Sequence, residues 1–264
     1  MLSSTRRESI LAELRDAGEV SVTLLAQRLG VSPSTVRRDL NTLSREGHLN
    51  RVRGGGAAES GTTTPGGPRP RQAEPDARPF GVVATDRVDA KDRIGARAAR
   101  LVPEHGVVVL DIGTTAARVA HHLRGRHVTV VTANLAVVDV LRDDPAVELV
   151  VLGGVLRRSY LSLVGGLTEQ ALSHISADVS VLGTSGVRAD GSPLDSTSTE
   201  VPVKQAILRS AARRVLVADA GKFPGSGLLA YTDPQDVDVL VTTPDADSSG
   251  LHALRRRGTE VLLA

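Results

Sequence analysis

Seven short runs rich in valine and leucine recur along the chain, and each is an element that must be buried. They occupy residues 107–110, 128–131, 149–152, 179–182, 215–218, 237–241 and 261–263. Such runs are typical of strands buried on both faces of a parallel sheet. Segments with helical patterns separate them, at residues 90–101, 115–123, 135–142, 168–174, 200–212 and 250–257. This alternation predicts an α/β domain with a mainly parallel sheet over residues 80–264, with its ligand site beyond the carboxyl ends of the strands.

Residues 57–79 separate this domain from a smaller one. The segment consists largely of glycine, proline, threonine, arginine and alanine, with almost nothing to bury, which predicts a flexible linker. The preceding residues 1–56 show three short helical patterns and a hairpin. An apolar stripe marks each of the first two helices. The stripe of the first consists of Ile10, Leu11 and Leu14, with Leu2 as a candidate extension. The stripe of the second consists of Leu24, Leu25 and Leu29. The order predicts a small winged helix-turn-helix domain.

The third helix of this small domain has a well-marked start. Ser32 suits the N-cap position and Pro33 the first helical position. The helix is expected to run to Gly47 with Val36 and Leu40 facing inward, followed by a hairpin strand. Hydroxyl and guanidinium groups are then left on its outer face, at Ser34, Thr35, Arg37 and Arg38.

Charge is unevenly distributed between the two parts. The whole chain has a net charge of +2, but residues 1–56 hold nine arginines against six acidic residues. Residues 80–264 hold twenty basic against twenty-one acidic residues. A small basic module on a near-neutral body is typical of a nucleic-acid reader, although a solvated basic face gives the same pattern.

A helix-turn-helix inserts its second helix into the major groove of DNA, where side chains contact bases and phosphates. The expected DNA contacts are Ser32, Ser34, Thr35, Arg37 and Arg38 on the helix, with Arg51 and Arg53 on the hairpin. Asp39 would repel phosphate, so we expect it to orient an arginine or to face away. The alternative is a small helical interaction domain with solvated arginines.

Small polar clusters follow the expected strands of the larger domain. In the first, Asp111-Ile112-Gly113-Thr114-Thr115 opens a helix, and a helix N-terminus of this kind attracts phosphate. Serine and threonine also cap helices for purely structural reasons. Since the carboxyl ends of parallel strands share one edge, the clusters predict a polar pocket. Its expected effector contacts are Asp111, Gly113, Thr114, Thr115, Asn134, Gly153, Gly154, Thr184, Ser185, Lys204 and Lys222.

Lysine is rare in this chain. Of thirty-two basic residues only Lys91, Lys204 and Lys222 are lysine, which suggests positions where the planar fork of arginine does not serve, although chance gives the same bias. Glu200 and Lys204 stand four residues apart, a spacing that fits a surface ion pair as well as a ligand contact.

The small domain resembles the DeoR family of bacterial regulators. The resemblance is carried by Val31-Ser32-Pro33-Ser34-Thr35-Val36-Arg37-Arg38-Asp39-Leu40, then Gly47 and Arg51-Val52-Arg53-Gly54-Gly55. Asn50 and Arg53 depart from the family pattern. The larger domain resembles the sensor domain of the same family through its Asp-x-Gly-Thr-Thr loop and Asp219–Phe223, with departures at Pro224 and at Thr132-Ala133-Asn134.

The resemblance implies a fold similar to ribose-5-phosphate isomerase. It also implies a repressor of carbohydrate-metabolism genes that binds double-stranded operator DNA and a phosphorylated sugar. A homo-oligomer, either a dimer or a tetramer, is expected because a dimer reads two half-sites. No cofactor is implied.

An enzyme is the alternative, namely a sugar-phosphate isomerase with a DNA-binding appendage. Such chemistry needs a carboxylate base and a group that stabilises the enediolate, and Asp111, Asp195, Glu200 and Lys222 are available. No tight acid–base constellation stands out among them, so we expect no catalysis.

Other function classes find less support. Gly113 is followed by two threonines instead of the Gly-x-Gly-x-x-Gly pattern of a dinucleotide site. With no cysteine and no ligand spacing among the histidines, we expect no metal. No apolar run is long enough to span a membrane and no signal peptide is evident, so we expect a cytoplasmic protein.

Overall fold

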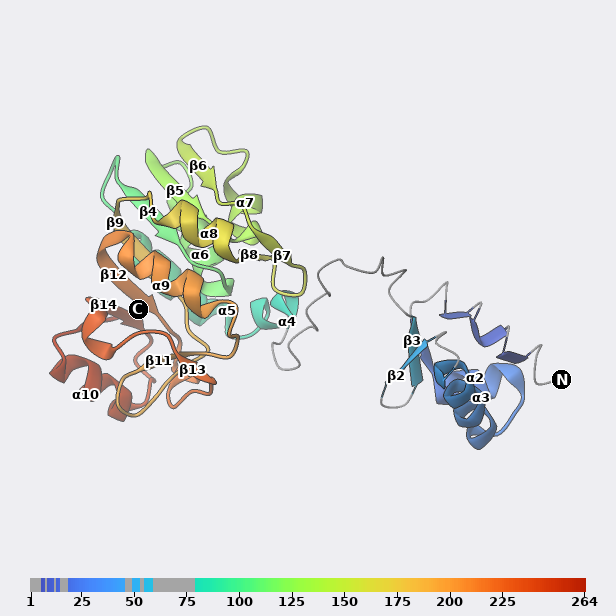
Figure 1. The fold of residues 1–264 in the computed structure, drawn as a ribbon. Helices are drawn as coiled ribbons and strands as arrows, with labels where there is room; N and C mark the ends of the chain where they lie inside the picture. Colours follow the sequence, from blue (N-terminus) through green and yellow to red (C-terminus); the bar gives the residue numbers. More distant parts are fainter. Residues whose placement is uncertain are drawn as a thin grey trace. The chain divides into compact units, whose positions relative to one another are not determined.

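The computed structural model describes residues 6–7, 9–11, 13–14, 19–45, 49–52, 55–58 and 79–264. The chain divides into two compact units, Met1–Gln72 and Ala73–Ala264, both drawn in Figure 1. Most of the expected linker, residues 59–78, lies outside the described residues. Its first two residues belong to a strand that ends at Ala58, so the small domain extends beyond the expected boundary at residue 56.

The first unit contains helices and a small antiparallel sheet. Residues 6–7, 9–11 and 13–14 are helical. They are followed by β1 (Glu19–Ser21), α2 (Val22–Leu29), α3 (Pro33–Arg45), β2 (Leu49–Val52) and β3 (Gly55–Ala58). The strands pair in the order β1-β3-β2, and β1 was not predicted. One apolar cluster, which includes Ile10, Leu25 and Leu40, joins the helices.

Two details of the first unit differ from the sequence prediction. Leu24 is 58% exposed, and α2 instead buries Val22, Leu25 and Ala26. The helix α3 ends at Arg45, before Gly47. Its start is as predicted, since the Ser32 hydroxyl accepts a hydrogen bond from the Thr35 N–H at 3.3 Å.

The second unit is built on a seven-stranded parallel sheet, as the apolar runs predicted. Its strands are β4 (Val107–Leu110), β5 (Val128–Thr132), β6 (Val147–Val151), β9 (Ala177–Leu182), β12 (Ala211–Val217), β14 (Val239–Thr242) and β15 (Glu260–Leu263). They pair in the order β15-β14-β12-β9-β4-β5-β6. Every neighbouring pair in this sheet is parallel.

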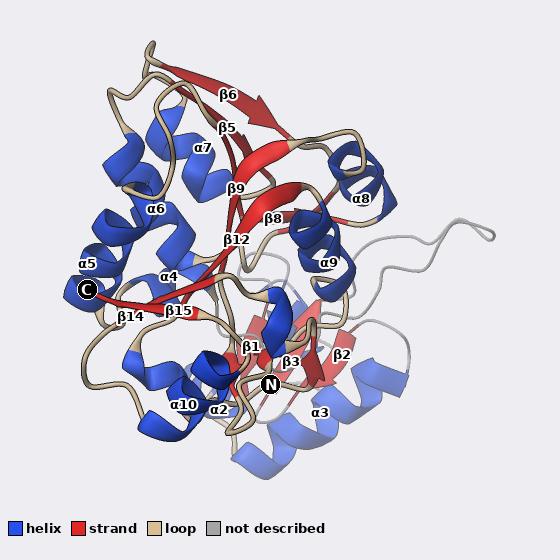
Figure 2. Cartoon of the chain, turned by 90° about the vertical axis from the view of Figure 1, so that its left-hand side faces the viewer, coloured by secondary structure: helices blue, strands red, loops and turns tan. Residues whose placement is uncertain are grey.

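Helices cover both faces of the sheet (Figure 2). One face carries α5 (Val88–Ala99), α6 (Thr114–Leu123) and α7 (Leu135–Leu141), and the other carries α8 (Gly166–Leu172) and α9 (Val201–Arg209). The first face buries a core that includes Ile94 and Leu123, and the second a core that includes Leu172 and Ile207. The helix α10 (Ser248–Arg256) packs through Leu254 on a third cluster. The layers therefore match the predicted α/β class.

Several short elements were missed because they carry no clear apolar period. They are α4 (Phe80–Ala84), the hairpin of β7 (Val155–Arg157) and β8 (Ser162–Val164), the small sheet of β10 (Gly186–Val187), β11 (Pro193–Asp195) and β13 (Leu229–Ala230), and the 3-10 helices η1 (Ala220–Lys222) and η2 (Pro234–Asp236). The helix expected to reach residue 212 ends at Arg209, because β12 begins at Ala211. Among all described helices, none is long and apolar enough to cross a membrane.

The strand order creates a crevice beside β4. After β4 the chain adds β5 and β6 on one side of it, and then returns to add β9, β12, β14 and β15 on the other. The connections that leave β4 and β9 therefore turn to opposite faces of the sheet. In open α/β sheets, ligands bind beyond the carboxyl ends of the strands at this kind of switch point.

Candidate functional site

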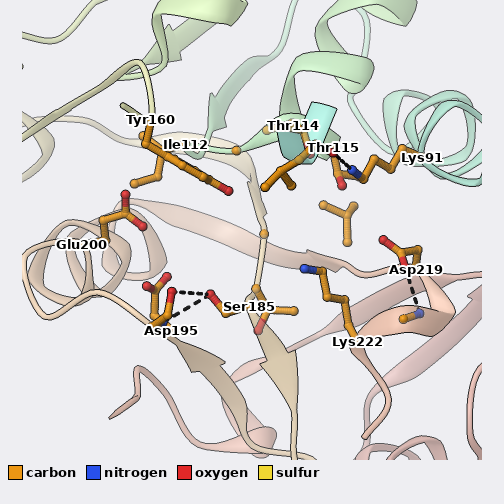
Figure 3. A pocket seen from close by; sticks show the side chains of 18 of the residues that line it. Lys91, Ile112, Thr114, Thr115, Tyr160, Ser185, Asp195, Glu200, Asp219 and Lys222 are labelled. Atoms are coloured by element: carbon orange, nitrogen blue, oxygen red, sulfur yellow. Dashed lines mark hydrogen bonds between the residues drawn. The ribbon is translucent and has the colours of Figure 1, made fainter. Parts of the chain in front are cut away.

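A pocket of about 580 Å³ lies at this switch point, within the second unit. The segment that follows β4 and the one that follows β9 supply its centre, Ile112–Ala116 and Gly183–Ser185. Figure 3 shows the side chains that line it. Further walls come from α4 and α5, the β7–β8 hairpin, the start of α9, and η1. Its position and size fit a small-molecule site.

The loop between β4 and α6 is held in a conformation that depends on Gly113. This residue has a φ of 129°, in a region that side chains disfavour. The buried amide of Asn134 donates to the carbonyl oxygens of Asp111 and Gly113, at 3.2 Å and 3.0 Å. Its own oxygen accepts from the N–H of Ala136 and so caps α7. Asn134 therefore supports the loop from behind. We had expected it to contact the effector, but it does not line the pocket.

The N-terminus of α6 opens into the pocket. Thr114 and Thr115 line the cavity, and neither hydroxyl has a hydrogen-bond partner among the described residues. The first N–H groups of a helix have no acceptor within the helix, and the helix dipole places partial positive charge there. This end of the pocket therefore offers hydrogen-bond donors to an anion.

All three lysines of the chain line this one pocket. Lys91 is 2% exposed and donates to the carbonyl oxygen of Val83. Burial lowers the pKa of Lys91 below its ordinary value. The Lys222 ammonium has no carboxylate partner within the described part of the chain. Figure 3 shows the two lysines reaching the same side of the pocket.

Lys204 is committed to a buried ion pair. Its ammonium donates to the Asp111 carboxylate and to the carbonyl oxygen of Gly183, and lies 3.6 Å from Asp195. Burial alone would lower the pKa of Lys204, but the charges of Asp111 and Asp195 raise it above its ordinary value. Asp111 is completely buried and also accepts from the N–H of Gly183 at 2.9 Å. Asp111, which we predicted to contact the ligand, is therefore placed behind the pocket wall and not among the residues that line it.

The other side of the pocket carries acidic and hydroxyl groups. Glu200 is 5% exposed and pairs with Arg157 of β7, so the surface pair with Lys204 considered above does not form. Asp195 accepts from the N–H of Thr197 at 2.8 Å. The Ser185 hydroxyl lies 3.2 Å from that of Ser196. These groups are all held by protein contacts and face the cavity.

Two further predicted residues, Gly153 and Gly154, lie outside the lining. Gly154 has a φ of 156°, and a Cβ there would lie 2.2 Å from the Thr168 hydroxyl oxygen. That hydroxyl donates to the carbonyl of Gly153 at 2.6 Å, so the pair shapes the turn into β7. Thr184 lines the pocket, but its hydroxyl is hydrogen-bonded to the backbone of Gly186 in its own turn and of Leu194 in β11. The predicted residues that the pocket brings together are Gly113, Thr114, Thr115, Thr184, Ser185, Lys204 and Lys222.

Some lining residues were not predicted. The scarcity of lysine in the chain was the only signal that could have identified Lys91 as a lining residue. Arg87 lies with its Nε 3.5 Å from the Asp219 carboxylate and lines the pocket from the start of α5. Tyr160 reaches the pocket from the turn between β7 and β8. No local pattern marks these two, because the contact depends on how distant segments pack.

The outer face of α3 in the first unit has the predicted character. Ser32, Ser34, Arg37 and Arg38 are exposed, and Thr35 is partly exposed. Asp39 is 7% exposed and pairs with Arg6 at 2.5 Å and 3.2 Å. It thus orients an arginine, as expected, and its charge is compensated on the inner side of α3.

The predicted hairpin contacts are described less fully. Arg51 belongs to β2, and Arg53 lies outside the described residues. No group of three or more histidine, cysteine or acidic residues in the described ranges could hold a metal ion.

Comparisons with known proteins agree with the two units. Residues 6–62 match the DeoR-like helix-turn-helix domain, and residues 86–243 match the DeoR C terminal sensor domain. The chain is 32% identical to the glycerol-3-phosphate regulon repressor of Haemophilus influenzae, over 100% of this chain and 98% of that protein. It is 30% identical to the repressor of the same name from Escherichia coli, over 96% of each chain. Ribose 5-phosphate isomerase A from Methanocaldococcus jannaschii aligns with a TM-score of 0.39 at 16% identity, over 52% of this chain and 55% of that one.

Proposed function

Because the chain belongs to the DeoR family of transcriptional regulators, we propose that it represses carbohydrate-metabolism genes through operator DNA and responds to a phosphorylated sugar. The sugar phosphate binds in the pocket of the second unit, and its binding alters the affinity for the operator. The named function of the relatives, repression of a glycerol-3-phosphate regulon, supports this class of effector.

One observation carries the proposal for the pocket. The N-terminus of α6 faces the same cavity as the ammonium groups of Lys91 and Lys222. The hydroxyls of Thr114 and Thr115 lie at this end of α6 and have no hydrogen-bond partner among the described residues. Backbone N–H groups and positive charge that converge on one small volume suit a dianionic phosphate. We assign the phosphate to this side of the pocket.

DNA binding is assigned to the outer face of α3. Arg37 and Arg38 pair with guanine or phosphate, and Ser34 and Thr35 donate to bases or phosphates at the start of the helix. Ser32 precedes them, and Arg51 and Arg53 of the wing reach the DNA backbone. Since one such unit contacts few phosphates, the regulator acts as a dimer or a tetramer, in the cytoplasm where its operator is.

Each carboxylate considered for the isomerase alternative lies beside a cationic group. Lys204 and Asp111 neutralise each other, and Arg157 holds Glu200. Asp195 also lies beside Lys204. A general base needs a carboxylate that can take a proton from the substrate. The pairing of these residues, together with the family of regulators to which the chain belongs, favours binding over turnover.

The Lys222→Ala variant tests the phosphate assignment. We expect it to bind inorganic phosphate and sugar phosphates about ten- to a hundredfold more weakly, because one charge-assisted contact is lost. Isothermal titration of the full chain measures the change. The control is Arg255→Ala, which removes an exposed charge on α10 outside the pocket. Equal phosphate affinity in the two variants would contradict the assignment.

A further inference from the structure

The acidic side of the pocket has no role in holding a phosphate. Figure 3 places Glu200 and Asp195 away from Lys91 and Lys222, with Ser185 between the two groups. Asp219 also lies on the lysine side, but Arg87 pairs with it, so Lys91 and Lys222 leave that side positive. The side of Glu200 and Asp195 has no such excess of positive charge and would repel a phosphate, so a ligand that fills the pocket must present a different group here. The chemistry of this side therefore constrains the part of the ligand that is farthest from its phosphate.

Glu200 is the residue best placed to contact that part. It immediately precedes α9, and its backbone is fixed by hydrogen bonds to Thr197 and from Lys204. Its carboxylate is almost completely buried and lines the pocket, with one oxygen, Oε1, paired with the Arg157 guanidinium. Arg157 also lies 5.9 Å from the ring of Tyr160, another lining residue. The carboxylate is thus held in a defined orientation at the cavity wall.

The charges at this side do not cancel within the protein. Arg157 compensates Glu200, but Lys204 alone lies beside both Asp111 and Asp195. Three carboxylates therefore face two cations, which leaves this side with one formal negative charge. A hydroxyl group of the ligand would donate a hydrogen bond to a carboxylate oxygen here.

We propose that Glu200 recognises a hydroxyl group at the end of the ligand opposite its phosphate, and so selects polyhydroxylated phosphates over shorter ones. This inference rests on the proposed function, since it takes the phosphate position from it. The ligand spans the pocket from the N-terminus of α6 to the start of α9. Glu200 then determines specificity, while the lysine side supplies affinity that all phosphates share.

The test compares the full chain with its Glu200→Gln variant, which keeps the size of the side chain and removes its charge. The probes are inorganic phosphate, glycerol 3-phosphate, ribose 5-phosphate, glucose 6-phosphate and glucosamine 6-phosphate, each titrated by calorimetry. The matched control is Glu260→Gln. Glu260 also pairs with an arginine, Arg213, but it is exposed on the edge strand β15.

We expect the wild-type protein to prefer hydroxylated sugar phosphates, aminated or not, over inorganic phosphate. We expect Glu200→Gln to lower the affinity for the preferred sugar phosphate about tenfold, because the hydrogen bond to the ligand hydroxyl loses its charged acceptor. The affinity for inorganic phosphate should not change. If Glu200→Gln lowered the affinity for the sugar phosphate and for inorganic phosphate equally, or lowered neither, this inference would be wrong. The assignment of the phosphate to the lysine side would not be affected. Failure of the wild-type protein to bind any phosphorylated probe would overturn the proposed function and this inference with it.

Discussion

Replacing Lys204 with methionine is expected to lower the free energy of unfolding of the second unit by about 3–5 kcal/mol. The change leaves the Asp111 carboxylate completely buried without its cationic partner, and it removes the donor to the Gly183 carbonyl as well. An isolated buried charge is far more costly than a buried apolar group. The loops that follow β4 and β9 would therefore lose one of the contacts that join them beside the pocket, while the hydrogen bond from the Gly183 N–H to Asp111 remains.

Urea unfolding monitored by tyrosine fluorescence measures this effect. The chain has two tyrosines and no tryptophan, and both Tyr160 and Tyr231 belong to the second unit, so the signal reports on that unit alone. The control is Arg213→Met, which breaks an exposed ion pair with Glu260 and should cost no more than about 1 kcal/mol. The double variant Lys204→Met, Asp111→Leu should recover much of the loss. A Lys204→Met variant as stable as the control would show that the pair does not stabilise the loops.

Replacing Arg37 and Arg38 together with alanine is expected to weaken operator binding about a hundredfold or more, since each contact contributes about 1–3 kcal/mol. Both side chains are exposed on α3, so the unit should keep its fold, which circular dichroism can check. The dependence of affinity on salt should also become less steep, because fewer counterions are released from the phosphates. Arg255→Ala, in the second unit, is the control for net charge.

Electrophoretic or fluorescence titration of DNA from upstream of the gene, at several salt concentrations, provides the measurement. If the double variant bound the operator as tightly as Arg255→Ala, with the same salt dependence, the assignment of α3 as the reading helix would be wrong.

Local patterns were sufficient to predict the seven strands of the main sheet and the longer helices, but not β1 or the short elements of the second unit. The strands were found because each is a run of buried apolar residues, and α3 because Ser32, Pro33 and Val36 mark its start and inner face. The same patterns also predicted which loops would share the edge of the sheet. Gly113, Thr114 and Thr115 lie in the pocket for that reason.

Contacts between distant residues could not be predicted in the same way. Asp111 and Lys204 are 93 positions apart, and Glu200 and Arg157 are 43 apart, so no periodicity reports their pairing. Its position in the loop after a strand assigned Asp111 to a ligand, and Lys204 was assigned either to a ligand or to a pair with Glu200, whereas in the fold Asp111 and Lys204 form an ion pair. Lys91 was marked only by the scarcity of lysine, a property of the whole composition.

The most direct test of the account is operator binding by the full chain, with and without a panel of sugar phosphates at fixed salt. The account predicts tight, sequence-selective binding that at least one sugar phosphate changes about fivefold or more, in either direction, with the response lost in Lys222→Ala. Binding of equal strength to every DNA sequence, with no effect of any sugar phosphate, would contradict it.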